Sequence, residues 1–275
     1  MGSVVFEFQK VCFNEFCIRW YSLLILTGVL IGISLLIREG RRFDISSEFL
    51  FNMAFWAIVF GLIGARIYYV IFNFSAYAKD PISILKVWEG GLAIHGGIIG
   101  GLLTIMIYCK KYGVSLIRIL DLCVVPLILA QAIGRWGNFF NMEAHGASTT
   151  LAHLQSLHIP QFIIKGMTIG GVVYQPTFLY ESLLCFLGFI ILVIVRRYRY
   201  LKVGIPTSIY LMYYGAVRFF IESMRTDSLM FGGIKMAQLV SVIMFIIGII
   251  YILSQSKKGK FESLYNDQYG KEIKF

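Results

Sequence analysis

Residues 116–146 read LIRILDLCVVPLILAQAIGRWGNFFNMEAHG, an apolar run that ends in a group of polar side chains. The apolar part, residues 116–133, is long enough to cross a bilayer as one helix, which needs about 17 to 25 predominantly apolar residues. The next segment, residues 134–146, holds an arginine, two asparagines, a glutamate and a histidine. We therefore expect a membrane helix that ends in hydrogen-bonding groups, and the fold depends on how many such runs the chain contains.

The overall composition is that of an integral membrane protein. Of the 275 residues, 58% are hydrophobic and 15% are charged, whereas soluble domains average about 45–50% apolar and 25% charged residues. Seven runs match the length of a span, at residues 20–37, 49–74, 91–109, 116–133, 176–195, 204–222 and 236–254. No small-residue cleavage site follows the first run, so we expect a retained span instead of a signal peptide. The predicted fold is one all-α, polytopic transmembrane domain over residues 1–275.

Basic residues in the short loops predict the orientation of these helices, because cytoplasmic loops are enriched in Lys and Arg. With the N-terminus outside, every inner segment is basic. The residues concerned are Arg38, Arg41 and Arg42, then Lys110, Lys111 and Arg118, then Arg196, Arg197, Arg199 and Lys202, and finally Lys257, Lys258, Lys260, Lys271 and Lys274. We predict an outer N-terminus, an inner C-terminus and a small extracytoplasmic arm or cap at residues 134–175.

Neither the net charge nor the cysteines indicate a further kind of site. The net charge is +10, but the basic residues alternate with apolar runs instead of gathering on one face, as nucleic-acid binding would require. Five cysteines, Cys12, Cys17, Cys109, Cys123 and Cys185, form no CxxC pair. Most lie in or beside apolar runs, so we interpret them as small apolar residues. Cys12 and Cys17 could pair if the N-terminus is outside, although nothing requires it.

Several ionisable residues fall inside or at the ends of the predicted spans. Each is costly there, at about 2.5–3.5 kcal/mol on insertion scales, and such residues are usually functional. The predicted topology places them all in the outer half of the membrane. They are Arg66, Arg135, Arg218, His95, Tyr21, Glu181 and Glu222. Any single one could reach the interface or form an internal ion pair, such as Arg218 with Glu222 at i,i+4, but the set favours an anion-binding cavity.

The anion that an outer-leaflet cavity chiefly meets is the phosphate of a phospholipid head group, which suits the planar fork of arginine. In EGGLAIHGGIIGG, residues 89–101, most glycines are expected to serve helix packing. Gly96 and Gly97, directly after His95, are the exceptions that we expect to face a ligand. The sequence has no HExxH motif, no aspartate cluster and no GxSxG elbow, so we expect no metal, no cofactor and no serine nucleophile. What remains is a general base with phosphate-stabilising cations, which suits a nucleophile that arrives on a second substrate.

These residues lie in blocks that resemble the prolipoprotein diacylglyceryl transferase family. GRWGNFFNMEAHG matches that family's signature, G-R-x-G-N-F-x-N-x-E-x-x-G, at every fixed position. Further blocks match in the family's order: IRWYSLL, GARIYYV, VWEGGLAIHGG, QPTFLYES and YYGAVRFFIE. Two positions depart from the pattern, since Gln175 replaces the usual histidine and Ser22 stands where glycine is common. A chemical role for residue 175 is therefore not expected.

The resemblance implies a multi-pass enzyme of the bacterial inner membrane, with its active site toward the extracytoplasmic leaflet. Its reaction transfers the diacylglyceryl group of phosphatidylglycerol to the lipobox cysteine of a prolipoprotein signal peptide, forming a thioether and releasing glycerol phosphate. The implied catalytic residues are His95, Arg135, Arg218 and Tyr21. The implied binding residues for phosphatidylglycerol are Arg135, Asn138, Arg218, Glu143, Gly146, Tyr214 and Arg66, with Glu222, Asp121 and Arg225 as supporting members.

General chemistry suggests a role for the main residues of this set. A free thiol has a pKa of about 8.5, so a positioned base raises its reactive fraction. His95 is the candidate base, with a phosphate ligand as its alternative role. Arg135 and Arg218 would stabilise the leaving phosphate, with Asn138 as a further donor, and Tyr21 would orient the head group.

Two other polar residues of the signature are expected to act outside the chemistry. Glu143 is expected to position an arginine or a backbone amide instead of acting as an acid, and His145 to be a solvated loop residue. Two other classes of protein compete with the enzyme. A lipid transporter predicts polar groups throughout the membrane and internal repeats, and a scaffold needs no arginine cluster.

Overall fold

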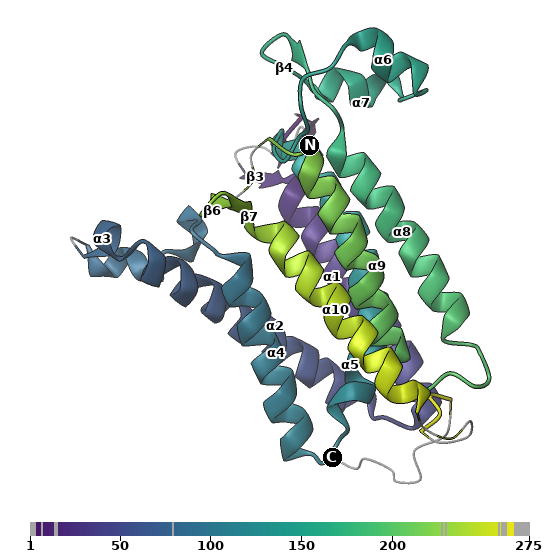
Figure 1. The fold of residues 1–275 in the computed structure, drawn as a ribbon. Coiled ribbons are helices and arrows are strands. Elements are labelled where there is room, and N and C mark those ends of the chain that lie inside the picture. Colours follow the sequence, from purple (N-terminus) through teal and green to yellow (C-terminus); the bar gives the residue numbers. More distant parts are fainter. Residues whose placement is uncertain are drawn as a thin grey trace. The chain divides into compact units, whose positions relative to one another are not determined.

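A computed structural model describes residues 4–6, 8–13, 16–78, 80–226, 228, 230–257, 259 and 263–266. The protein is mainly helical, and within these residues seven helices have 18 residues or more (Figure 1). They are α1 (Trp20–Gly40), α2 (Ser47–Phe72), α4 (Ile94–Lys111), α5 (Leu116–Asn141), α8 (Thr177–Val195), α9 (Ile205–Met224) and α10 (Met236–Ser256).

Five of the long helices, α1, α2, α5, α8 and α10, are long and apolar enough to cross a membrane. Many large apolar side chains on them are exposed, as lipid-facing side chains would be. The chain is therefore a multi-pass membrane protein. Helix α4 carries a histidine and two lysines, and α9 carries an arginine and a glutamate, which makes both less apolar. Seven spans, and their orientation, stay predictions.

The chain forms two compact units. The second runs from Leu36 to Ile119, and its helices α2 and α4 pack against each other. Glycines allow this approach: a Cβ added to Gly64 or Gly96 would collide with the carbonyl group of the other, and one added to Gly97 would contact Ala65 at 3.7 Å. The expectation that Gly96 faces a ligand is therefore wrong, because the backbone of α2 fills that space, while the same expectation for Gly97 stays a prediction.

The first unit combines the residues up to Leu35 with Leu120–Asp267. In it α9 packs between α8 and α10, which lie beside it in Figure 1. Its core joins α5, α8 and α9 through apolar side chains, with Cys185 fully buried among them. The hydroxyl of Ser182 on α8 donates to the carbonyl of Ala132 on α5 at 2.8 Å. These contacts fix three helix ends near one another.

Short elements connect the long helices. The described residues include three small antiparallel sheets, so the all-α prediction holds for the long helices only. Strands of two to four residues are too short to leave a periodic pattern in the sequence. The sheets are β1 (Val4–Phe6), β2 (Lys10–Phe13) and β3 (Phe16–Arg19); β4 (Thr168–Ile169) and β5 (Val172–Val173); and β6 (Met230–Phe231) and β7 (Ile234–Lys235). The remaining elements are η1 (Arg41–Phe43), α3 (Phe74–Tyr77), η2 (Pro81–Leu85), η3 (Val87–Glu89), α6 (Leu151–Ser156) and α7 (Gln161–Gly166).

The predicted arm begins later than expected. Helix α5 continues through GRWGNFFN to Asn141, because no proline or turn pair interrupts the sequence after residue 133. The arm that follows consists of α6, α7 and the β4–β5 hairpin. The side chains of Cys12 and Cys17 lie outside the described residues, although β2 and β3 place the two backbones opposite each other.

Candidate active site

The last turns of α5 present the polar residues of the signature. Arg135 and Asn138 are three positions apart and thus share a face of the helix, with Arg135 Nη1 3.4 Å from Asn138 Oδ1. After the helix, Met142 and Ala144 adopt positive φ values of 55° and 57°. This turn brings Glu143 back, so that its carboxylate accepts hydrogen bonds from the side-chain amide of Asn138 at 3.0 Å and from that of Asn141 at 3.2 Å. The described partners of Glu143 are therefore side-chain amides, and not the arginine or backbone amide that was expected.

One buried carboxylate joins the two arginines that the sequence singled out. Glu181 on α8 lies between Arg135 on α5 and Arg218 on α9. Its Oε1 is 3.0 Å from Arg135 Nη2, and its Oε2 is 3.1 Å from Arg218 Nη1. Arg135 and Arg218, 83 positions apart in the chain, therefore converge on one small anionic group.

The ion pairs continue along α9. Arg218 Nη2 is 2.7 Å from Oε2 of Glu222, the i,i+4 ion pair that the sequence offered as an alternative to an anion-binding role, and Glu222 also lies 4.0 Å from Arg225 Nη1. The side chains of Glu181 and Glu222 are 2–3% exposed, whereas those of Arg135 and Arg218 are 21% and 17% exposed. The arginine side chains therefore keep some exposed surface, while the carboxylates that they contact are covered.

Tyrosines complete the surroundings of Arg135. Its Nη2 donates to the hydroxyl of Tyr214 at 3.4 Å, and the Tyr214 ring stacks on that of Tyr210, with 5.7 Å between centroids. The ring of Tyr21 on α1 lies against Gly137, where a Cβ atom would be 2.6 Å from it. Glycine is thus needed at position 137, because the aromatic ring of Tyr21 occupies the space that a side chain would fill.

Gly146 joins the two ends of the arm, at residues 146 and 175, through its backbone. Its N–H donates to the carbonyl of Gln175 at 3.0 Å, and it forms a β-bridge with Arg225. A Cβ atom here would come within 2.9 Å of the Gln175 side chain. Residue 175 thus binds Gly146 through its backbone carbonyl. The neighbouring His145 is half-buried, with its ring 4.1 Å from that of Tyr174, and not a fully solvated residue.

Two functional candidates were missed in the sequence. Glu181 was noted only for its depth, and nothing in its local sequence indicates that it bridges two arginines. Lys235, in β7, was not considered. Its Nζ donates to the carbonyls of Glu222 at 2.8 Å and Arg225 at 2.9 Å, and so caps the end of α9.

Arg66 and His95 belong to the second unit, and are described there by themselves. Arg66 is 6% exposed and makes five hydrogen bonds, which engage all the N–H groups of a guanidinium. The acceptors are the carbonyls of Ser83, Ile84, Lys86, Gly90 and Gly91. Arg66 therefore holds the 83–91 segment and has no donor left for a phosphate. His95 lies exposed in the first turn of α4, with its ring 6.0 Å from that of Tyr68.

Asp121 lies away from the arginines within the first unit. It is 14 residues before Arg135 on α5, about 21 Å along the helix. Its carboxylate accepts from the N–H of Gly204 at 2.5 Å and from both the N–H and the hydroxyl of Thr207, at 3.0 and 2.6 Å. It therefore caps the start of α9 and supports the site only through the fold.

Known proteins resemble the chain over most of its length. A family model described as prolipoprotein diacylglyceryl transferase matches residues 10–254. A protein of Staphylococcus saprophyticus is 46% identical over 242 residues, which are 88% of this chain and 86% of its own. A protein of Bacillus cereus is 44% identical over 268 residues, 97% of this chain and 99% of its own. Both relatives are named phosphatidylglycerol–prolipoprotein diacylglyceryl transferase.

Proposed function

The chain belongs to the prolipoprotein diacylglyceryl transferase family, and from this membership we propose where and how it performs the family's reaction. It transfers the diacylglyceryl group of phosphatidylglycerol to prolipoproteins in lipoprotein maturation. The proposed site of the transfer is the face of Arg135 and Arg218 on the first unit.

The shared carboxylate of Glu181 is the observation that carries this proposal. Two guanidinium groups that meet one carboxylate are spaced to grip one anionic head group, because phosphate and carboxylate present similar oxygen acceptors to the arginine fork. The exposed sides of Arg135 and Arg218 would receive the phosphate of phosphatidylglycerol, while Glu181 holds them from behind. Donors fixed before the lipid arrives need little reorganisation during the reaction.

The reaction is a displacement at carbon. The thiolate sulfur of the lipobox cysteine attacks the carbon of the diacylglycerol moiety that carries the phosphate ester oxygen. A carbon–sulfur bond forms at this carbon as its bond to that oxygen breaks. The electron pair of the broken bond stays on the oxygen, so that glycerol phosphate leaves with one more negative charge. Arg135 and Arg218 stabilise this charge as it develops, with Asn138 as a neighbouring donor. The products are the thioether and glycerol phosphate.

The thiol must lose its proton before or during the attack. His95 is the proposed base, since an imidazole titrates near neutral pH and can accept the proton of a thiol. Tyr21 and Tyr214 are proposed to orient the head group, because Tyr214 contacts Arg135 and Tyr21 packs against the same helical turns. Arg66 and Asp121 are left out of the lipid site, since both are engaged by backbone groups elsewhere.

The site is proposed to face the extracytoplasmic leaflet of the bacterial inner membrane. Arg135 lies near the end of α5, Glu181 near the start of α8 and Arg218 near the end of α9. The basic loops favour an orientation in which these three helix ends are outside. The prolipoprotein would meet them there as it emerges from the membrane.

Reconstitution tests the proposal directly. The purified chain in vesicles is incubated with labelled phosphatidylglycerol and a lipobox peptide, and the peptide is analysed by mass spectrometry. We expect a diacylglyceryl thioether on the cysteine and an equal amount of free glycerol phosphate. A peptide with serine in place of the cysteine is the control. Movement of the label between leaflets without a peptide product would instead indicate a lipid transporter.

A further inference from the structure

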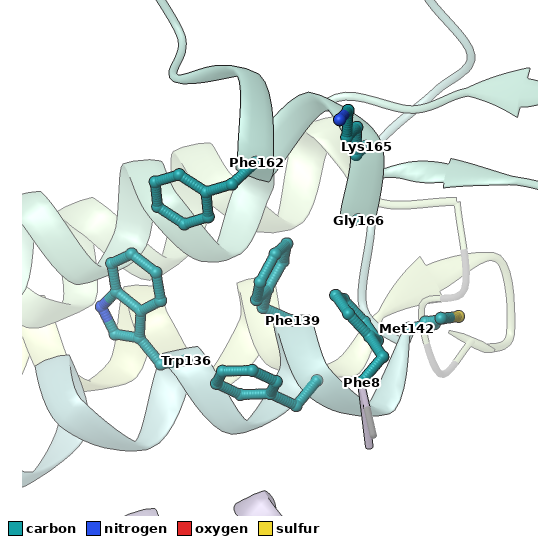
Figure 2. A pocket seen from close by; sticks show the side chains of 8 residues that line it. Phe8, Trp136, Phe139, Met142, Phe162, Lys165 and Gly166 are labelled. Carbon is teal, nitrogen blue, oxygen red and sulfur yellow. The ribbon is translucent and has the colours of Figure 1, made fainter. Parts of the chain in front are cut away.

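An aromatic cavity lies beside the arginine site, within the first unit (Figure 2). Its volume is about 440 Å³, which is within the usual range for ligand pockets. Among the described residues, Lys165 is the one charged member of the lining. The lining residues are Phe8, Trp136, Phe139, Phe140, Met142, Phe162, Lys165 and Gly166.

The cavity has a rigid floor and an open rim. The buried ring of Phe139 stacks on that of Phe178, with 4.8 Å between centroids, and meets Phe8 edge-on at 5.2 Å. Gly166 allows α7 to approach, since a Cβ atom there would collide with the Phe139 ring. Phe162, on α7, is 57% exposed and, in Figure 2, its ring lies across the space from α5. The cavity is thus preformed at its base and accessible from outside.

The cavity and the arginine site occupy neighbouring faces of the same helical turns. Trp136, Phe139 and Phe140 on α5 line the cavity. Arg135 directly precedes Trp136, and Asn138 directly precedes Phe139. From Arg135 to Phe139 the helix advances about 6 Å. An extended polypeptide advances about 3.3 Å per residue, so a side chain two to four residues from a cysteine at the arginines can reach the cavity.

We propose that this cavity binds an apolar side chain of the polypeptide substrate, two to four residues from the cysteine that is modified. This inference rests on the proposed function, because it takes the arginines as the place of transfer. It assigns a specificity site to the base of the arm, where α7 and the segment around Phe8 meet the end of α5.

The position of the cavity favours a peptide over the acyl chains of the lipid. Helix α5 has 26 residues and is about 39 Å long, whereas the hydrocarbon core of a bilayer is about 30 Å thick. The cavity lies at its last two turns, against residues 162–166 and Phe8, which are outside the predicted spans. Acyl chains occupy the core, but the residues around the modified cysteine emerge at this level.

Peptide and enzyme substitutions together test the assignment. With the wild-type enzyme, a set of lipobox peptides is compared in which a polar residue replaces the native one at each of four positions on either side of the cysteine. KM is measured for each peptide and for phosphatidylglycerol. One of these positions should require an apolar residue, with a rise in peptide KM of about fivefold or more. The variant Phe162→Ala should raise the peptide KM to a similar extent, remove this dependence and leave the KM for the lipid unchanged.

Leu157→Ala is the matched control, because Leu157 is an exposed apolar residue of the arm, 47% exposed, that does not line the cavity. Circular dichroism and a thermal melt check the fold, and Phe162→Leu replaces Phe162→Ala if the latter does not fold. If Phe162→Ala raises only the KM for the lipid, the cavity binds an acyl chain and the proposal is overturned. The proposal is also overturned if Phe162→Ala still requires an apolar residue at the same peptide position. Absence of thioether in the wild type would instead refute the proposed function.

Discussion

Arg135 and Arg218 contact opposite oxygens of one buried carboxylate, although they lie on different helices and 83 positions apart. Both contacts of the Glu181 carboxylate are direct, at 3.0 Å to Arg135 Nη2 and 3.1 Å to Arg218 Nη1. Breaking a buried ion pair leaves an uncompensated charge and is strongly destabilising, at about 3–5 kcal/mol. The pair of arginines should therefore behave as one unit whose geometry depends on Glu181.

Glu181→Gln should lower kcat/KM by about a hundredfold, because a displacement of catalytic groups by about 1 Å has an effect of this size. The side chain keeps its shape but loses the charge that both arginines face. The measurement is thioether formation at several lipid concentrations, with a thermal melt of each protein. Glu48→Gln, at the start of α2 in the other unit, is the control. Full activity in Glu181→Gln would show that the bridge does not position the arginines.

Arg135→Lys and Arg218→Lys should each lose most activity although the charge is retained. Lysine offers a point charge without the planar fork that binds two oxygens at once, and loss of one transition-state donor costs about 10² to 10³ in kcat. Rates with saturating lipid give the measurement. Arg199→Lys, at an exposed arginine, should keep normal rates. Near-normal turnover in both active-site variants would contradict bidentate binding of the phosphate.

Lys235→Met should reduce activity through α9, because the ammonium group that caps the carbonyls of Glu222 and Arg225 is lost. Hydrogen bonds from a charged donor contribute about 1.5–3 kcal/mol, and their loss would loosen the turn that carries the Glu222 carboxylate. We expect kcat to fall by about tenfold or more, and Lys235→Arg to recover much of it. Equal loss in both variants, with an unchanged melting temperature, would argue against a positioning role.

The sequence allowed the helices and part of the site to be predicted, for identifiable reasons. Long apolar runs indicate membrane helices because the bilayer sets their length, and arginines in them stand out because they are costly. Partners could not be predicted in the same way. Glu181 lies 46 positions after Arg135 and 37 before Arg218, and only packing of α5, α8 and α9 brings the three together.

Arg66 shows that a charged residue in a membrane span, although energetically costly, can serve the fold instead of the reaction. Its position inside a span made it a candidate for lipid binding, but its acceptors are backbone carbonyls that have no sequence signal. Gly96 gives a similar lesson, since a glycine that contacts a helix backbone and one that contacts a ligand look alike in sequence. Asp121 was named because the family resemblance implies a supporting role, and its partners in the structure are the N–H groups at the start of α9.

Arg66→Lys should destabilise the protein without a specific effect on the lipid. One ammonium group cannot satisfy the carbonyls that the guanidinium binds, and each buried group left unsatisfied costs about 1–3 kcal/mol. We expect a lower midpoint of thermal unfolding and greater proteolysis of the 83–91 segment. The KM for phosphatidylglycerol should stay within about twofold among the molecules that remain folded. A raised lipid KM with an unchanged melt would return Arg66 to the lipid site.

His95→Gln should abolish most activity at neutral pH and regain it as the pH rises. Loss of a general base costs about 10² to 10⁴ in rate, but the thiol of the peptide ionises by itself above its pKa of about 8.5, so the need for a base falls at high pH. The rate of thioether formation is therefore measured from pH 7 to 10, together with binding of phosphatidylglycerol vesicles. His153→Gln, in the arm helix α6, should follow the wild-type profile. If the His95 variant stays inactive at pH 10 and also binds the lipid poorly, the imidazole holds the phosphate and is not the base.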